Sequence, residues 1–452
     1  MRISVLGCGY LGAVHAVSMA ALGHDVLGVD VDAERVSALA AGRPPFFEPG
    51  LEEALRGLLD SGRLRFAAAS AAGGLGAAEL HFITVGTPQS GEDGSADLRY
   101  VESAVDGILA ALPTGERTVV VGKSTVPVGT AGRLAGRLEP HGATLVWNPE
   151  FLREGYAVED TLHPDRIVYG LSDDPGHARR GREALDAAYG PLLAEGAPRI
   201  ITNYPTAELV KVAANSFLAT KISFINAMSE LCEATGGDVV VLSEALGHDA
   251  RIGSSFLRSG IGFGGGCLPK DIRAFVARAE ELGVEDAVSF LRHVDAINQR
   301  RRDRVMALAR QCLGGGVEGA RVAVLGAAFK PGSDDVRESP ALEIALRLHR
   351  QGAHVRICDP RALEAVGRLH PELDTRPDPL AALEGAELVL LLTEWDEFVG
   401  LDPRLAGSRV ARRLVIDGRN ALDAPRWREA GWVCLGLGRP HPVLHGPWNA
   451  PR

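Results

Sequence analysis

A cysteine at the end of a glycine-rich segment is the residue of this chain best suited to covalent chemistry. Cys267 ends the segment GIGFGGGC, residues 260–267, and is followed by Lys270 and Asp271. Glycines let backbone amides and a small ligand approach closely, because no side chain stands in the way. A thiol with an ammonium group nearby favours a nucleophilic thiolate. The alternative is a glycine-rich turn with an incidental cysteine, and the motifs elsewhere in the chain weaken it.

The amino-terminal residues have the pattern of a dinucleotide-binding site. A buried-type strand over residues 2–6 leads into GCGYLG at residues 7–12, and a helical segment and a second strand ending at Asp30 follow. Such glycines bring a pyrophosphate to a helix N-terminus, and the acid binds the adenosine ribose. Because Asp30 repels a 2′-phosphate, we expect NAD rather than NADP as the cofactor. Arg35 is the one nearby residue that favours the alternative, since it could reach such a phosphate.

Length and composition fit a globular enzyme. The chain has 452 residues, enough for two or three domains, and its net charge of −10 gives no support for nucleic-acid binding. Its six cysteines lack C-x-x-C or metal-type spacing, so neither a disulfide framework nor a metal site is indicated. Residues 3–24 carry no Asp, Glu, Lys or Arg, but their glycines and the strand that follows fit the dinucleotide pattern better than a signal peptide. No other stretch approaches a membrane span, and we expect a cytoplasmic protein.

Strand and helix signals alternate over residues 1–203, which we expect to form a dinucleotide-binding domain. Loops after the predicted strands carry Gly-Thr-Pro at residues 86–88, KSTVP at 123–127 and NPEFLREG at 148–155. In an open parallel sheet, such loops lie at the end where ligands bind.

The rest of the chain divides into a helical part and a second strand-helix part. Residues 204–310 begin with a long helix that no breaker interrupts, and residues 311–452 return to strand-helix alternation without the glycine pattern. We therefore expect the third part to bind something other than NAD. Its proline-rich end from Gly438 is expected to be a mobile tail. The predicted fold is α/β, with two doubly wound Rossmann-like domains joined by a central helical region that contains a long helix.

Lysine is scarce in this chain, and its positions are therefore informative. Arginine supplies most positive charges, so the few lysines are candidates for roles that need a compact ammonium able to lose its proton. Of 48 basic residues, five are lysine: Lys123, Lys211, Lys221, Lys270 and Lys330.

These residues together suggest a dehydrogenase that uses a thiol. An alcohol is oxidised to an aldehyde, Cys267 traps it as a thiohemiacetal, and a second oxidation gives a thioester that water hydrolyses. The helical Lys211 and Asn215 and the carboxylate of Glu150 are suited to these steps. Basic groups in the third part, Lys330 and Arg419, could hold a phosphorylated substrate.

The same motifs, in order over nearly the whole chain, resemble the UDP-glucose/GDP-mannose dehydrogenase family; Phe329-Lys330 and DGRN at residues 417–420 add to the match. The resemblance implies a four-electron oxidation of a nucleotide sugar with two NAD and no metal. UDP-glucose is the expected substrate, and GDP-mannose or a UDP-N-acetylhexosamine is the alternative. A non-catalytic regulator that binds NAD and a nucleotide sugar is a third possibility, which the intact residues named above oppose.

The resemblance also implies the domain roles and the oligomer. Residues 1–203 would bind NAD, 204–310 would carry the cysteine loop and the dimerisation surface, and 311–452 would bind the UDP moiety. We expect a homodimer or a higher homo-oligomer, with a small-molecule nucleotide sugar as the partner and neither nucleic acid nor membrane.

Roles carry over to matching positions. Cys267 is the expected nucleophile, Lys211 and Asn215 stabilise the oxyanion, Glu150 is the general acid/base, and Thr125 and Asp271 position water and the reacting groups. Cofactor contacts are implied at Gly7, Gly9, Tyr10, Leu11, Gly12, Asp30, Arg35, Thr87, Ser124, Thr125, Glu154, Lys270 and Arg337. Substrate contacts are implied at Glu150, Phe151, Leu152, Arg153, Glu154, Lys211, Asn215, Arg251, Phe256, Leu257, Phe263, Gly264, Phe329, Lys330 and Arg419, with Arg251 expected to reach a neighbouring subunit. One departure is Gly266, where many members have serine.

Overall fold

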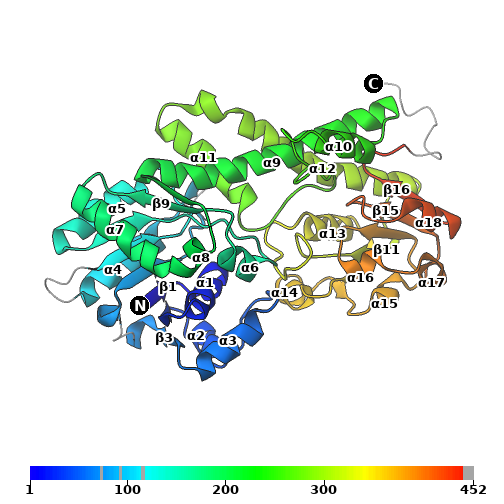
Figure 1. Cartoon of the computed structure of the whole chain (residues 1–452). Coiled ribbons are helices and arrows are strands. Elements are labelled where there is room, and N and C mark those ends of the chain that lie inside the picture. The colour runs from blue at the N-terminus through cyan, green and yellow to red at the C-terminus, as the bar shows by residue number, and fades with distance from the viewer. Residues whose placement is uncertain (72–74, 91–93, 113–117, 441–452) are drawn as a thin grey trace. The chain divides into compact units, whose positions relative to one another are not determined.

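The structure is a computed structural model that describes residues 1–71, 75–90, 94–112 and 118–440. Most of the proline-rich end, residues 441–452, lies outside the described residues. The chain forms two compact units, residues 1–214 with 273–285, and residues 215–272 with 286–452 (Figure 1). Two of the three divisions fall within the helices α9 (Tyr204–Thr235) and α11 (Leu268–Glu281), and the third falls between residues 285 and 286. The division into three parts expected from the sequence stays a prediction.

The first unit is built on an eight-stranded sheet of order β10-β9-β8-β7-β4-β1-β2-β3. Its strands are β1 (Arg2–Leu6), β2 (Asp25–Asp30), β3 (Leu64–Ala68), β4 (Leu80–Ile83), β7 (Val119–Gly122), β8 (Thr144–Trp147), β9 (Ile167–Leu171) and β10 (Arg199–Asn203), and a separate hairpin pairs β5 (Gln89–Ser90) with β6 (Ser95–Ala96). Neighbouring strands from β3 to β8 are parallel, but β8 and β9 pair antiparallel. The open parallel sheet expected from the sequence therefore ends at β8.

Helices cover both faces of this sheet, as a doubly wound fold requires. Buried residues of α1, α3, α7 and α8 pack on one face with Ile3 and Val5 of β1, whereas α4 and α5 pack on the other face with Leu6. The helices of this unit are α1 (Tyr10–Ala21), α2 (Ala33–Ala40), α3 (Leu51–Asp60), α4 (Arg99–Ala111), α5 (Thr130–Leu138), α6 (Ala157–Leu162), α7 (Pro175–Ala188) and α8 (Gly190–Ala194).

The second unit contains a six-stranded parallel sheet of order β13-β12-β11-β14-β15-β16. Its strands are β11 (Arg321–Leu325), β12 (His354–Cys358), β13 (Asp374–Thr375), β14 (Leu388–Leu391), β15 (Leu414–Asp417) and β16 (Val433–Gly436). The helices that complete it are α10 (Val239–Gly247), α12 (Phe290–Cys312), α13 (Pro340–Arg350), α14 (Leu363–Leu369), α15 (Pro379–Leu383), α16 (Asp396–Val399), α17 (Pro403–Gly407) and α18 (Ala424–Glu429). The expected α/β fold with two doubly wound sheets and a long helix is confirmed.

Local sequence signals explain several element boundaries. Ser339, predicted to start a helix, is the N-cap of α13, and its hydroxyl accepts a hydrogen bond from the Leu342 amide at 3.3 Å. Asp359, at the end of β12, accepts from the amides of Ala327 and Ala328, as Asp30 does from Cys8 in the first unit. The two sheets therefore share one arrangement. In each, the aspartate at the carboxyl end of β2 or β12 accepts hydrogen bonds from the turn that follows the neighbouring strand, β1 or β11.

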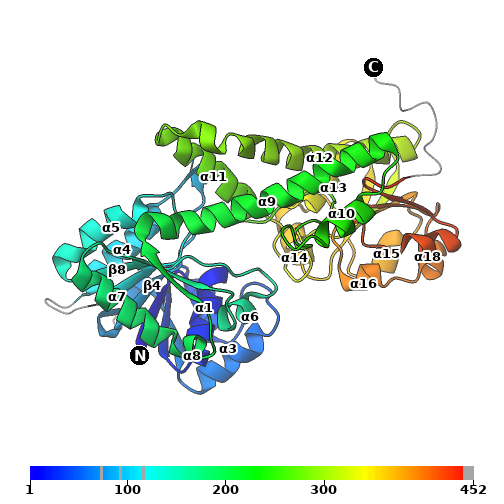
Figure 2. The same cartoon turned by 45° about the horizontal axis from the view of Figure 1, so that its top comes forward.

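The cysteine segment rests on a pair of long helices in the second unit. There α12 lies beside α9 (Figure 2), and the Ser223 hydroxyl of α9 donates to the Val294 carbonyl of α12 at 2.7 Å. Arg301 of α12 donates to the Ser229 hydroxyl of α9 at 3.0 Å. This pair provides a rigid support for the loop that carries Cys267.

Candidate active site

The turn between β1 and α1 has the geometry that a dinucleotide needs. Gly7 has φ +92°, and a Cβ on Gly12 would lie 1.8 Å from the Gly7 carbonyl oxygen, so both positions require glycine. A Cβ on Gly9 would meet nothing within 4 Å, which leaves this side of the turn open. The N-terminus of α1 has no side-chain cap and no acid in its first turn. Its amides are therefore suited to a pyrophosphate.

Asp30 lies at the carboxyl end of β2, beside this turn. Its side chain accepts hydrogen bonds from the Cys8 amide at 2.7 Å and the Asp32 amide at 2.9 Å. Arg35 lies 3.2 Å from both carboxylate oxygens. Arg35, whose guanidinium could attract a 2′-phosphate, is thus paired with Asp30, which would repel one.

The Asp30 carboxylate should set the cofactor preference. We expect kcat/KM for NAD to exceed that for NADP by at least about tenfold, because a 2′-phosphate beside Asp30 is repelled, and Asp30→Ala should reduce the ratio. Initial rates of NADH and NADPH formation by the two proteins measure it. Equal use of both cofactors by the wild-type protein would mean that Arg35, not Asp30, governs the site.

The loops after β7 and β8 hold Glu150 in a defined position. Its Oε1 accepts from the amides of Phe151 and Leu152 at 2.8 and 3.1 Å, and its Oε2 lies 3.0 Å from Lys123 Nζ. Burial raises the pKa of Glu150, but the charge and hydrogen bond of Lys123, the Phe151 amide and the charge of Lys211 together bring it below its usual value. Glu150 is therefore a carboxylate at neutral pH.

Further contacts in the first unit involve the Phe151 ring and the loops after β4 and β7. Lys211 Nζ lies 5.7 Å and Arg166 Cζ 3.9 Å from the centre of the Phe151 ring. The Thr87 hydroxyl donates to the Thr125 carbonyl at 2.8 Å. The structure therefore brings Lys211, Phe151 and Glu150 into one region of this unit.

Two predicted residues nearby have contacts other than those expected. The Ser124 hydroxyl donates to the Val85 carbonyl at 2.7 Å, which ties the loops after β4 and β7 together. Arg153 is exposed and forms an ion pair with Asp160 at 2.6 Å. Their roles toward cofactor and substrate stay predictions.

In the second unit, Cys267 is exposed and immediately precedes α11. Its carbonyl accepts from the Asp271 amide at 2.9 Å. Asn215 of α9 donates to Asp271 Oδ2 at 2.7 Å, and Lys270 lies 2.8 Å from Asp271 Oδ1. A helix N-terminus favours a negative charge. The predicted nucleophile, Asn215, Asp271 and Lys270 thus form one connected group.

Buried polar side chains fix the glycine-rich segment before the thiol. Asn298 of α12 accepts from the Phe263 amide at 2.8 Å and donates to the Phe263 carbonyl at 3.0 Å. Arg301 donates to the Gly260 carbonyl at 3.1 Å. Asn298 and Arg301 were not predicted from the sequence, because they stand in an arginine-rich helix without a pattern that distinguishes them.

Arg419 connects this segment to the loop after β11. It donates to the carbonyls of Gly262 and Phe329 at 3.1 and 3.0 Å, and also to the Leu392 carbonyl at 2.7 Å. Glu394 lies 3.3 Å away. Arg419 was predicted to contact substrate, and in this structure its donors bind backbone carbonyls. The Lys330 ammonium lies 5.6 Å from the Phe329 ring centre.

Gly266 lies against the side chain of Arg337. A Cβ there would lie 2.6 Å from Arg337 Cζ, at the far end of a flexible side chain, so a serine would need only the guanidinium to shift. Arg337 is itself paired with Asp335 at 2.6 Å, and its carbonyl accepts from the Gly265 amide at 2.9 Å. Gly264 is more strictly confined, since its Cβ would lie 2.2 Å from the backbone carbonyl oxygen of Glu338.

The segment after α10 carries the remaining predicted substrate contacts. Phe256 has φ +64°, a conformation uncommon for a bulky residue, whereas Leu257 is buried. Arg251 is paired with Asp249, and its side chain is 89% exposed. Its contact with a neighbouring subunit stays a prediction.

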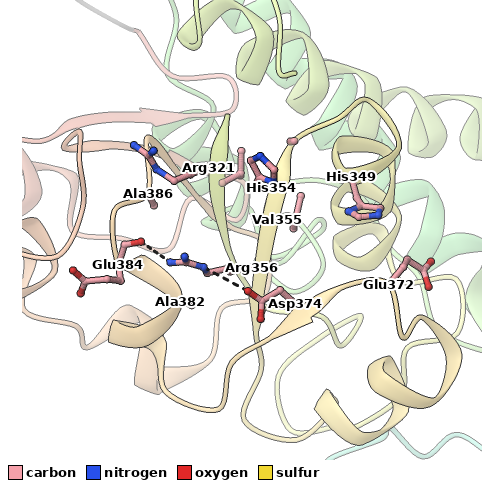
Figure 3. A pocket seen from close by; sticks show the side chains of 12 residues that line it. Arg321, His349, His354, Val355, Arg356, Glu372, Asp374, Ala382, Glu384 and Ala386 are labelled. Atoms are coloured by element: carbon pink, nitrogen blue, oxygen red, sulfur yellow. Dashed lines mark hydrogen bonds and ion pairs between the residues drawn. The ribbon is translucent and has the colours of Figure 1, made fainter. Parts of the chain in front are cut away.

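A separate cavity of about 360 Å³ lies at the amino ends of β11 and β12 (Figure 3). Its arginines are already engaged, because Arg356 contacts Asp374 and the Glu384 carbonyl, and Arg321 donates to the Gly385 carbonyl. Ligands of open α/β sheets bind at the opposite, carboxyl ends of the strands.

Within the described ranges, no helix is long and apolar enough to cross a membrane, and no cluster of His, Cys, Asp or Glu is suited to a metal.

Comparisons with known proteins agree with this geometry. Residues 1–191, 205–300 and 323–424 match the NAD binding domain, the central domain and the UDP binding domain of the UDP-glucose/GDP-mannose dehydrogenase family. UDP-glucose 6-dehydrogenase of Pseudomonas aeruginosa is 41% identical over 97% of this chain and 98% of its own.

Two solved structures are similar over almost their whole length. A UDP-glucose dehydrogenase from Pyrobaculum islandicum is 42% identical with a TM-score of 0.86, and covers 97% of this chain and 98% of its own. A UDP-D-ManNAc dehydrogenase from Pyrococcus horikoshii is 27% identical with a TM-score of 0.82, and covers 97% and 99%. The expected NAD cofactor and dehydrogenase class are confirmed, and the chain belongs to the UDP-glucose/GDP-mannose dehydrogenase family.

Proposed function

We propose that this protein is a UDP-glucose 6-dehydrogenase, which oxidises UDP-glucose to UDP-glucuronate with two NAD. The observation that carries the proposal is the identity of 41% and 42%, over nearly complete chains, to two UDP-glucose dehydrogenases, against 27% to the UDP-D-ManNAc enzyme. The intact Cys267, Lys211, Asn215 and Glu150 support a catalytic protein over a regulator.

In the proposed chemistry, C6 of the sugar is oxidised twice, and between the two oxidations it is bound to the sulfur of Cys267. In each oxidation, bound NAD supplies the acceptor of a hydride from C6. The C6 hydroxyl loses a proton and a hydride, and the Cys267 thiolate adds to the resulting aldehyde as a thiohemiacetal. Loss of a second hydride and the hydroxyl proton gives a thioester. Water then cleaves the carbon–sulfur bond, which releases the carboxylate and regenerates the thiol.

The other residues act on oxygen and on protons. Lys211 and Asn215 stabilise the oxygen that becomes negative when sulfur adds, and Glu150 accepts the proton of the hydrolytic water. Thr125 and Asp271 position that water and the reacting groups. The cofactor and substrate contacts implied by the family resemblance complete the proposed site.

We also infer a homo-oligomer located in the cytoplasm. An exposed apolar stripe runs along the second-unit part of α9, where Phe217, Phe224 and Leu231 recur at seven-residue spacing and are 67%, 48% and 56% exposed. Seven residues make about two helical turns, so the three side chains share a face that a second copy would cover. The six cysteines form no disulfide in the described part of the chain, which suits a reducing compartment. The molecular mass in solution tests the assembly.

A panel of nucleotide sugars tests the substrate. NADH formation with UDP-glucose should exceed that with GDP-mannose, UDP-N-acetylglucosamine and UDP-N-acetylmannosamine by at least about tenfold in kcat/KM. Faster oxidation of another member of the panel would reassign the substrate within the family, and binding without NADH formation would favour the regulator.

A further inference from the structure

Lys123, at the end of β7, is a buried ammonium group whose hydrogen-bonding capacity is fully used. The residue is 4% exposed. Its Nζ lies 3.0 Å from Glu150 Oε2, 3.0 Å from Asn148 Oδ1 and 3.4 Å from the Tyr189 hydroxyl oxygen. A protonated lysine has three donors and no acceptor. The three oxygen acceptors around Lys123 therefore match the three N–H donors of its ammonium group.

The directions of the surrounding hydrogen bonds match three donors on Lys123. Asn148 donates its Nδ2 to the Val168 carbonyl at 2.9 Å, which turns its Oδ1 toward Lys123. The Tyr189 hydroxyl donates to the same Oδ1 at 2.7 Å, so its proton is already used. Asn148 and Tyr189 therefore both present oxygen acceptors to Lys123.

Neighbouring titratable groups leave Lys123 as the cation in contact with Glu150. Burial, and then the charge of Lys123, lower the pKa of His15 on α1, so this imidazole is neutral. Burial and the Glu150 charge raise the pKa of Tyr189. Lys211 on α9 also lowers the pKa of Glu150, but less than Lys123 does. Without Lys123, the burial of Glu150 would lack its largest compensation.

We propose that Lys123 is a positioning residue that keeps the Glu150 carboxylate ionised and oriented, so that Glu150 is ready to accept a proton. The assignment rests on the proposed function only for the step that uses this proton, the hydrolysis of the thioester. It also gives a reason for a lysine here in an arginine-rich chain. A planar guanidinium fork cannot direct its donors to three acceptors arranged around one nitrogen.

The pH dependence of turnover distinguishes this role from a structural one. In Lys123→Met, the pKa of Glu150 should rise, because burial remains and the cation is gone. The proton-accepting form then exists only at higher pH, so the acid limb of the kcat profile should move up by at least about one pH unit, with activity recovering as pH rises. Lys123→Arg should lower kcat but keep the limb near its wild-type position, because the charge remains.

Tyr189→Phe is the matched control. It removes the hydroxyl that donates to Asn148 Oδ1 and accepts from Lys123 at 3.4 Å, but leaves the contact between Lys123 and Glu150 in place. Its acid limb should coincide with that of the wild-type protein. An unmoved acid limb in folded Lys123→Met would overturn the proposal, as would a limb shifted equally by Tyr189→Phe.

Stability provides a test that needs no activity. Lys123→Met and Glu150→Gln should each lower the unfolding midpoint, because each leaves one buried charge without its partner. The double variant Lys123→Met/Glu150→Gln has neither charge and should recover part of the combined loss. Additive losses would overturn the pairing. If Lys123→Met alone fails to fold, a folded double variant supports the pairing, and a double variant that also fails to fold overturns it. A wild-type protein that does not oxidise UDP-glucose would refute the proposed function but leave this coupling measurable.

Discussion

Replacing Cys267 with alanine is expected to lower the rate of sugar-acid formation by at least about 10³-fold, because no other group can form the thioester. Cys267 is the exposed cysteine at the end of a segment that Asn298, Arg301 and Arg419 fix through its backbone. A smaller side chain should leave that backbone intact. The residues predicted to bind NAD at positions 7–35 belong to the first unit, so the dissociation constant for NAD should change by less than about twofold.

Chromatography of the product and titration with NAD measure the two effects. Cys312→Ala is the matched control, since Cys312 is the partly buried last residue of α12, and it should retain wild-type turnover. Acid formation by Cys267→Ala at a rate near that of the wild-type protein would exclude a covalent role for this thiol.

Replacing Lys211 with arginine is expected to lower kcat by about 10² or more. Lys211 lies beside Phe151 and acts electrostatically on Glu150, and its compact ammonium is proposed to meet the developing oxyanion. Arginine keeps the charge, but its guanidinium is larger, forked and unable to give up a proton at working pH. The variant therefore tests whether the shape and proton of the lysine matter, rather than its charge alone.

Lys221→Arg on the same helix is the control. Lys221 lies ten residues further along α9, about 80° around the helix axis from Lys211. Its ammonium donates to the carbonyls of Ile252 and Gly253 at 3.0 and 3.4 Å, contacts that a guanidinium can also make. The variant should have nearly wild-type kcat and KM. A silent Lys211→Arg, or a strongly impaired Lys221→Arg, would show that the scarcity of lysine is no guide to function.

Signals local in sequence predicted much of the fold. The glycine pattern before α1, the acids that end β2 and β12, and the Ser-Pro start of α13 each fix a backbone feature within a few residues. The direction of β9 was not predictable, because it depends on pairing with a distant strand. A strand's own residues do not say which way its neighbour runs.

The candidate site was likewise only partly predictable from local sequence patterns. Cys267, Glu150 and Lys211 stand in recognisable motifs. However, the Lys123 contact to Glu150 and the side-chain hydrogen bonds that fix the segment before Cys267 come from distant residues. Lys123 contacts Glu150 within one network that also contains Tyr189, and nothing in the sequence marks that tyrosine. For Arg419, the residue type suggested a phosphate contact, whereas the structure shows donors bound to carbonyls of three separate segments. Such pairings follow from tertiary packing, which local patterns do not specify.

The number of NADH formed for each UDP-glucuronate tests the central claim most directly. With UDP-glucose limiting and NAD in excess, absorbance gives NADH and chromatography gives the sugar acid and any aldehyde. If Cys267 holds the substrate between two oxidations, two NADH should form per acid and no free aldehyde should accumulate. One NADH per substrate, with an aldehyde or ketone as the product, would contradict the four-electron mechanism.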